Sequence, residues 1–227
     1  VFLPEDGTPV ERRRVAHEDP GRVPRDPRAY RGVLITGSSA RLHDEEPWME
    51  ALEELVRAAA HHAVPVLGVC FGHQLIARAL FGPRAVRPMA EVEVGWRELH
   101  PVRPGGFLAR AQASAGLAPG PFRCFVSHAD EVVAGAPGTA DLLVHARSAD
   151  CAVQAYRVRG LPLFGLQFHC ELPLPEAREL FVSRTGADRE RWSLTRRGRM
   201  LQRAVDRADL WRALRGDFLA RCRPDGQ

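Results

Sequence analysis

The chain has 227 residues, 32 of them basic and 28 acidic, and a formal net charge of +4. All 32 basic residues are arginine, and the absence of lysine excludes a Walker A loop, a pyridoxal Schiff base and a kinase active site from this chain. We therefore expect no cofactor, and the small net charge gives little reason to expect a nucleic-acid partner.

The length favours one domain of ~100–200 residues with an extension. The apolar runs are far shorter than the ~18 residues that a membrane span needs, and we find no secretory apolar segment. Five cysteines without C-x-x-C spacing argue against a disulfide framework or a zinc site. We expect a protein of the reducing cytoplasm, with no membrane association and no metal.

The first predicted elements are a strand over residues 31–36 and a helix that begins near Pro47. The helix carries apolar side chains at helical spacing, which we interpret as a core face: Trp48, Met49, Leu52, Leu55, Val56 and Ala59. A charged, proline-rich segment precedes the strand.

Residues 68–72 read Gly-Val-Cys-Phe-Gly and join an apolar run to a helical pattern. A strand, a sharp turn and a helix with a nucleophile at the apex is the arrangement of G-x-S-x-G hydrolases, here with Cys70 in the serine position. Gly68 and Gly72 permit the close backbone approach that such a turn requires. The N-terminus of a helix would lower the pKa of Cys70 from its ordinary value of ~8.5. A buried structural cysteine is the alternative interpretation, which the flanking pattern disfavours.

From residue 85 to residue 168 the pattern changes to short strands, over 92–99, 124–127, 142–145, 152–158 and 161–168. Glycine and proline pairs separate them as turns. Alternating strands and helices followed by a series of strands indicate an α/β protein with a mixed, largely parallel central sheet flanked by helices.

The last of these strands is followed by His169 and Glu171. Strand ends in α/β sheets are where catalytic side chains gather. The two-residue period places both side chains on one face, where the carboxylate can orient the imidazole and the imidazole can act as base for Cys70. A strand-capping histidine beside a surface glutamate is the simpler alternative. Cys170 should point to the opposite face as a buried thiol.

Beyond residue 184 the chain is rich in arginine and acidic residues. Its apolar positions predict one amphipathic helix: Leu201, Val205, Ala208, Trp211, Leu214 and Phe218. We divide the chain into a catalytic domain, 1–183, and a helical extension, 184–227. The helix is expected to dock on its own domain, with a homodimer contact or a partner synthase as alternatives.

Together these motifs resemble the class I, triad-type glutamine amidotransferases. The G-x-C-x-G-x-Q pattern falls on residues 68–74, and the Q-x-H-P-E pattern falls on residues 167–171 with Cys170 in place of proline. Weaker matches are residues 34–39 for the oxyanion strand and residues 127–130 for an S-H-x-D segment. The resemblance covers roughly residues 30–182 and is nearest to the glutaminase part of GMP synthetases and its stand-alone relatives.

The resemblance implies a flavodoxin-like fold and a Cys70–His169–Glu171 triad. It also implies backbone oxyanion donors at Gly37, Ser38 and Phe71 and substrate contacts from Gln74, Ser127 and His128. The family's first strand and helix have no counterpart before Tyr30, so we expect the N-terminal unit to be incomplete or remodelled.

The predicted activity is hydrolysis of the glutamine side-chain amide to glutamate and ammonia, with the ammonia passed to a separate synthase. Two alternatives remain. One is a stand-alone hydrolase of another γ-glutamyl amide or conjugate, and the other is a catalytically silent interaction module.

Overall fold

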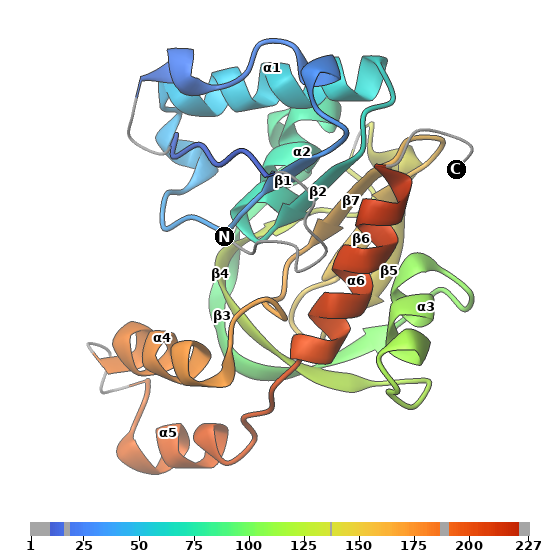
Figure 1. Cartoon of the computed structure of the whole chain (residues 1–227). Coiled ribbons are helices and arrows are strands. Elements are labelled where there is room, and N and C mark those ends of the chain that lie inside the picture. The colour runs from blue at the N-terminus through green and yellow to red at the C-terminus, as the bar shows by residue number, and fades with distance from the viewer. Residues whose placement is uncertain (1–9, 16–18, 137, 187–190, 223–227) are drawn as a thin grey trace.

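The computed structural model describes residues 10–15, 19–136, 138–186 and 191–222. These residues form one curled seven-stranded sheet with helices on both sides (Figure 1). Along the sheet the strand order is β1-β2-β7-β6-β5-β3-β4.

The sheet is mixed, as predicted, but only two of the six strand pairings among the described residues are parallel, so it is not the largely parallel sheet expected. Parallel pairing joins β1 (Val33–Ile35), β2 (Val66–Val69) and β7 (Leu163–Leu166). The other neighbours pair antiparallel, and they are β6 (Ala155–Val158), β5 (Leu142–Arg147), β3 (Val86–Pro101) and β4 (Phe122–Val132). The carboxyl ends of the three parallel strands therefore share one edge of the sheet, where residues 36–38, 70 and 167–171 follow them.

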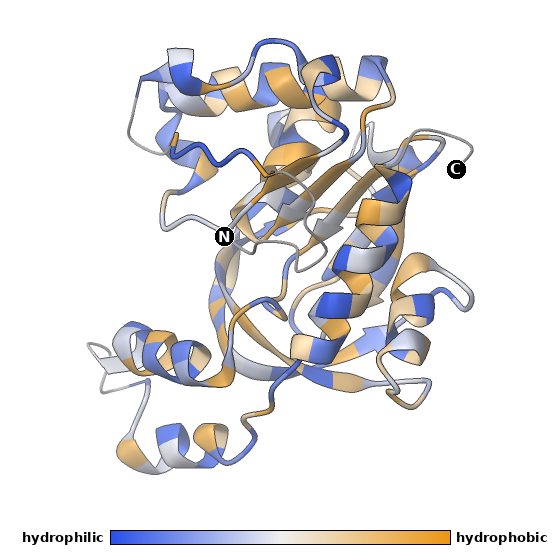
Figure 2. Ribbon diagram, viewed as in Figure 1, coloured by the Kyte–Doolittle hydropathy of each residue, from blue (hydrophilic) through white to orange (hydrophobic). Residues whose placement is uncertain are grey.

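Helices cover both faces of the parallel part. Val66 packs in a cluster with the apolar residues of α1 (Pro47–His61) and α2 (Phe71–Phe81). Leu67, the next residue, packs in a second cluster with α3 (Phe107–Ser114) and α6 (Ala208–Arg221). This alternation follows from the two-residue period of a strand and explains why β2 is apolar throughout (Figure 2).

A third cluster lies away from the central strands. The helices α4 (Leu174–Gly186) and α5 (Leu194–Leu201) pack against the β3–β4 hairpin (Figure 1). Phe181 and Met200 from these helices are buried in one apolar cluster with Trp96 and Phe125 of the hairpin. Gly95, at φ +107°, lies against Met200, where a side chain would be both strained and obstructed.

The C-terminal apolar stripe forms two helices rather than the single helix expected. The carbonyl of Val205, in the connection between α5 and α6, accepts a hydrogen bond from the Trp96 indole at 3.2 Å. This bond holds the connection against the hairpin. The apolar side chains of α6 are buried against its own domain: Leu210, Trp211, Leu214 and Phe218.

The N-terminal segment contains little regular structure. Its described residues before β1 hold only the short 3-10 turns Pro20–Arg22 and Pro27–Ala29. Similar turns occur at Leu42–Asp44, Pro83–Ala85 and Thr139–Asp141. Within the part of the chain that the structure describes, no helix is both long and apolar enough to cross a membrane.

Candidate active site

Cys70 lies at the sharp turn between β2 and α2. Its backbone has φ 51° and ψ −103°, a conformation that costs free energy for a residue with a side chain and recurs at nucleophile elbows. A Cβ on Gly68 would lie 2.3 Å from the carbonyl oxygen of Gly72, and one on Gly72 would lie 2.2 Å from that of Ile35. The two glycines are therefore required by close backbone approach, as the sequence predicts.

His169 and Glu171 follow the carboxyl end of β7 and interact directly. The Nδ1 atom of His169 lies 2.6 Å from the Oε1 atom of Glu171. The backbone N–H of His169 donates to the carbonyl of Phe125 at 2.8 Å, which fixes the strand end against β4. Since Nδ1 is engaged by the carboxylate, Nε2 is the nitrogen left to exchange a proton with another group.

The imidazole and the thiol meet beside Gly37, which follows β1. A Cβ on Gly37 would lie 3.2 Å from the Cε1 atom of His169 and 3.6 Å from the Cβ atom of Cys70. The structure thus brings three chain segments, far apart in the sequence, to one point. Their arrangement has the order nucleophile, base and orienting carboxylate.

The pKa of His169 is raised although its side chain is buried. Burial alone would lower the pKa of His169, but the charges of Glu171 and Cys70 and hydrogen bonds with both raise that pKa well above its ordinary value of 6.5. These interactions favour the protonated form of the His169 imidazole beside the Glu171 carboxylate. Burial, with the nearby Cys124 and Glu171, raises the pKa of Cys170 well above its ordinary value, which suits an inert thiol.

The predicted oxyanion donors flank the same point. Phe71 is the first residue of α2, where backbone N–H groups have no partner within the helix. Ser38 follows Gly37, and its hydroxyl accepts from the N–H of Ala40 at 3.1 Å. The Ser38 side chain is thereby turned towards its own loop.

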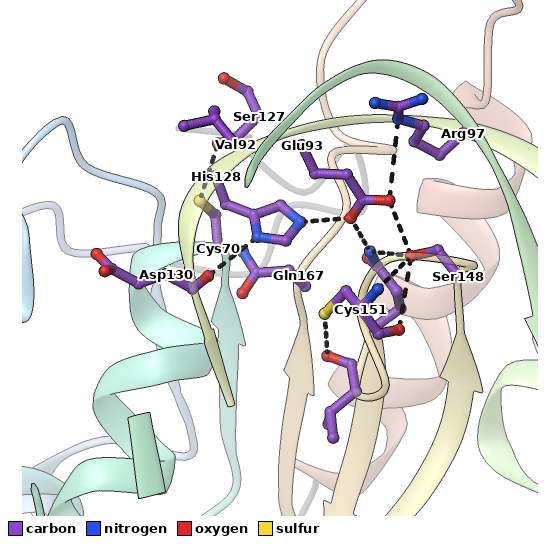
Figure 3. Close-up of polar contacts among 12 residues, drawn as sticks. Cys70, Val92, Glu93, Arg97, Ser127, His128, Asp130, Ser148, Cys151 and Gln167 are labelled. Atoms are coloured by element: carbon purple, nitrogen blue, oxygen red, sulfur yellow. Dashed lines mark hydrogen bonds and ion pairs between the residues drawn. The ribbon is translucent and has the colours of Figure 1, made fainter. Parts of the chain in front are cut away.

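The predicted substrate-binding residues occupy two different positions. Ser127 is adjacent to the nucleophile, because its carbonyl lies 3.8 Å from the Sγ atom of Cys70 (Figure 3). The side chains of Gln74 and His128 are buried and hydrogen-bonded inside the protein. Any contact with substrate from Gln74 or His128 therefore requires their backbone or a change of partner.

A second buried polar group lies beside His128, and sequence reasoning missed it. Glu93, His128 and Cys151 present ligand atoms within 4.8 Å of one another (Figure 3). The carboxylate of Glu93 accepts from the Ser148 hydroxyl at 2.8 Å and from the Gln154 amide at 2.7 Å.

Glu93 is charged in this group. Burial would raise its pKa, but hydrogen bonds from His128 and Ser148 and the charges of His128 and Arg97 lower it. The carboxylate already has donors on both oxygens, so the donor set is satisfied without a cation. The sequence carries no distinct signal for this group, because the predicted strand over residues 92–99 also contains Arg97 and Glu98.

The sheet, the elbow and the His–Glu pair define an α/β protein with a cysteine at the active-site turn. Residues 8–184 match the sequence model of the family described as glutamine amidotransferase class-I. The chain therefore belongs to this family of enzymes.

Individual relatives agree with this membership, and a solved structure agrees with the fold. A glutamine-hydrolyzing GMP synthase subunit of Methanopyrus kandleri is 35% identical over 145 residues, 64% of this chain and 68% of that protein. Gamma-glutamyl peptidase 5 of Arabidopsis thaliana is 30% identical over 63% of this chain and 54% of that protein. A glutamine amido transferase structure from Methylobacillus flagellatus has a TM-score of 0.69, covering 90% of this chain and 82% of that chain at 24% identity, which supports the fold. The match spans 52% to 68% of the length of three such GMP synthase subunits.

Proposed function

We propose that the protein hydrolyses the side-chain amide of glutamine to glutamate and ammonia. The observation that carries this function is the convergence of Cys70, His169 and Glu171 beside Gly37, in a chain of the glutamine amidotransferase family.

In this mechanism Nε2 of His169 first takes the thiol proton, and the Sγ atom of Cys70 then attacks the amide carbon. Glu171 holds the imidazole through Nδ1 and stabilises its positive charge. The oxyanion is bound by backbone N–H groups at Phe71 and at Gly37–Ser38, and one such donor is worth ~3–4 kcal/mol in the transition state.

The tetrahedral intermediate collapses when His169 returns its proton to the leaving nitrogen, which departs as ammonia. The product on the enzyme is a γ-glutamyl thioester at Cys70. Water then loses a proton to His169, attacks the thioester carbon and releases glutamate, and the proton returns to the sulfur.

The fate of the ammonia follows from the relatives. The Methanopyrus kandleri protein is by its name one component of a glutamine-hydrolyzing GMP synthase. We infer that this chain also passes ammonia to a separately encoded synthase.

The five cysteines are free thiols, which suits a reducing cytoplasm. The predicted homodimer through the C-terminal helix would have to use residues outside the apolar face of α6, which is buried in its own domain.

A second candidate is hydrolysis of a γ-glutamyl peptide by the same triad, which the similarity to gamma-glutamyl peptidase 5 favours. The chemistry at the thiol is identical, and only the leaving group differs. A silent interaction module is disfavoured because His169 contacts Glu171 at 2.6 Å and because the His169 ring and Cys70 both lie beside Gly37.

The deciding experiment measures glutamate release from glutamine and from γ-glutamyl peptides such as glutathione. Wild type should act on glutamine with the higher kcat/KM, and Cys70→Ala should act on neither. Cys151→Ala is the matched cysteine control and should behave as wild type. A higher kcat/KM for the peptides would establish the second candidate, and inactivity on both substrate types would contradict both.

A further inference from the structure

A chain of hydrogen bonds begins at the buried carboxylate beside the candidate active site. The Oε2 atom of Glu93 accepts from the Gln154 amide at 2.7 Å and lies 2.9 Å from the Nε2 atom of His128. On the other side of the same ring, Nδ1 of His128 lies 3.0 Å from the carbonyl oxygen of Asp130 (Figure 3). The Glu93 side chain thus connects β3 to His128 on β4 and to Gln154, which directly precedes β6.

The chain of bonds continues and closes on itself. The Gln74 amide donates to the Asp130 carbonyl and to the Oε1 atom of Gln167, both at 2.9 Å. The backbone N–H of Gln167 donates to the carbonyl of Gln154 at 2.8 Å. Because Gln154 also binds Glu93, these six residues form a closed hydrogen-bonded ring.

Three members of the ring lie close in the sequence to the residues that are proposed to react. Gln74 lies one turn after Cys70 on α2, and its N–H donates to the Cys70 carbonyl at 3.1 Å. Gln167 lies two residues before His169. His128 directly follows Ser127, whose carbonyl faces the Cys70 thiol. The ring therefore links the three segments that must be aligned for reaction.

The contacts of the His128 ring make Glu93 and His128 the anchor of the ring of hydrogen bonds. Nδ1 of His128 lies 3.0 Å from a carbonyl oxygen and Nε2 lies 2.9 Å from a carboxylate oxygen, so both edges of the imidazole are held. The result is a buried imidazole–carboxylate contact between two side chains that are each 1% exposed, and its directional geometry holds one arrangement of the strands. Removal of Glu93 would leave Nε2 of His128 without its buried acceptor.

The hydrogen bonds of the ring orient the side-chain amides of Gln154 and Gln167. The Oε1 atom of Gln154 and the Nε2 atom of Gln167 are buried and have no hydrogen-bond partner among the described residues. The ring bonds are therefore what sets the orientation of each amide. A break at Glu93 would be transmitted through Gln154 to the segment that carries His169.

We propose that Glu93, through its contact with His128, is a positioning residue that sets the alignment of Cys70 with His169. This inference rests on the proposed glutaminase function. It predicts a defect in the alignment of the reacting groups and leaves the thiol itself chemically competent.

The test compares Glu93→Gln with wild type. We expect kcat/KM for glutamine to fall about 100-fold, because a misplacement near 1 Å has that effect. Labelling of Cys70 by a glutamine-shaped diazoketone should fall in parallel. Alkylation of Cys70 by iodoacetamide, which needs only an accessible thiolate, should stay within about threefold of wild type.

Two further variants separate positioning from folding. Gln167→Met breaks the ring by removing the Gln74 contact without stranding a charge, and it should reproduce the kinetic defect if Glu93→Gln does not fold. Cys151→Ala lies in the same buried group but outside the ring, and it should keep wild-type kcat/KM.

Wild-type kcat/KM in both ring variants would overturn the inference while leaving the proposed function intact. Equal losses of diazoketone and iodoacetamide reactivity would also overturn it, since they would indicate general distortion of the elbow. A wild type that neither hydrolyses glutamine nor reacts with the diazoketone would overturn the proposed function and this inference together.

Discussion

Gly37 offers a direct test of the pairing between the thiol and the imidazole. In Gly37→Ala the new Cβ would lie 3.2 Å from the His169 ring, where ordinary contacts begin at 3.4 Å. The ring must therefore move by a few tenths of an ångström, although its hydrogen bond to Glu171 opposes that movement. A full 1 Å misplacement costs about 100-fold in rate, so we expect kcat/KM for glutamine to fall about 5- to 10-fold. Gly37→Val, which places two more carbons in the same space, should lose at least about 100-fold.

The same substitution should not destabilise the protein. Gly37 is exposed and is not among the glycines with positive φ, so alanine there restricts the unfolded chain without straining the folded backbone, and the only cost is the small displacement of the His169 ring. The free energy of unfolding should stay equal or rise by about 0.4–1 kcal/mol. Gly198→Ala, in α5 with no atom within 4 Å of the new Cβ, is the control that should gain stability and keep full activity.

The assay is steady-state glutamine hydrolysis combined with urea unfolding of each variant. Loss of activity with retained stability would place the defect at the reacting groups. Full activity in Gly37→Val would refute the idea that Cys70 and His169 work together across Gly37.

Three other changes test the site. Gly72→Ala would place a Cβ 2.2 Å from the carbonyl oxygen of Ile35, and it should lower the free energy of unfolding by about 1–3 kcal/mol in urea titrations, whereas wild-type stability would contradict the tight turn. Cys170→Pro restores the family pattern at a buried thiol and should keep glutamine hydrolysis within about tenfold, ~1.4 kcal/mol of barrier, while a larger loss would give Cys170 a chemical role. The pKa of His169 is raised in the folded protein, so its contribution to stability is fully present below the unfolded pKa of ~6.5 and is lost as pH rises through the folded value. In urea unfolding across pH, the stability advantage of wild type over Glu171→Gln should be largest at the acidic end, and a pH-independent difference would contradict the imidazolium–carboxylate pair.

The elbow and the mixed α/β fold could be predicted because their causes are local. Gly68 and Gly72 predict a tight turn, and the apolar run before Cys70 predicts a buried strand. The family assignment is confirmed, and the catalytic roles of His169 and Glu171 stay predictions that the observed contact supports.

The ring around Glu93 could not be predicted, because its members come together only when distant segments pack. Glu93 meets Ser148 and Gln154, more than fifty residues later in the chain, across a sheet whose strand order is not sequential. A strand pattern reports which face is buried but not which side chains from other strands share that face.

The C-terminal helix was predicted too long for a similar reason. Apolar spacing from Leu201 to Phe218 fits one helix, yet the Val205 carbonyl binds the Trp96 indole of the β3–β4 hairpin instead. Tertiary contacts overrode the local pattern.

The central claim is that Cys70 is the nucleophile of a glutamine-hydrolysing triad. The most direct measurement is peptide mass spectrometry of the protein after reaction with a glutamine-shaped diazoketone, with excess glutamine as competitor. We predict one adduct, on Cys70, that glutamine suppresses and that His169→Ala greatly slows. An adduct on Cys170, or labelling that glutamine does not suppress, would contradict the claim.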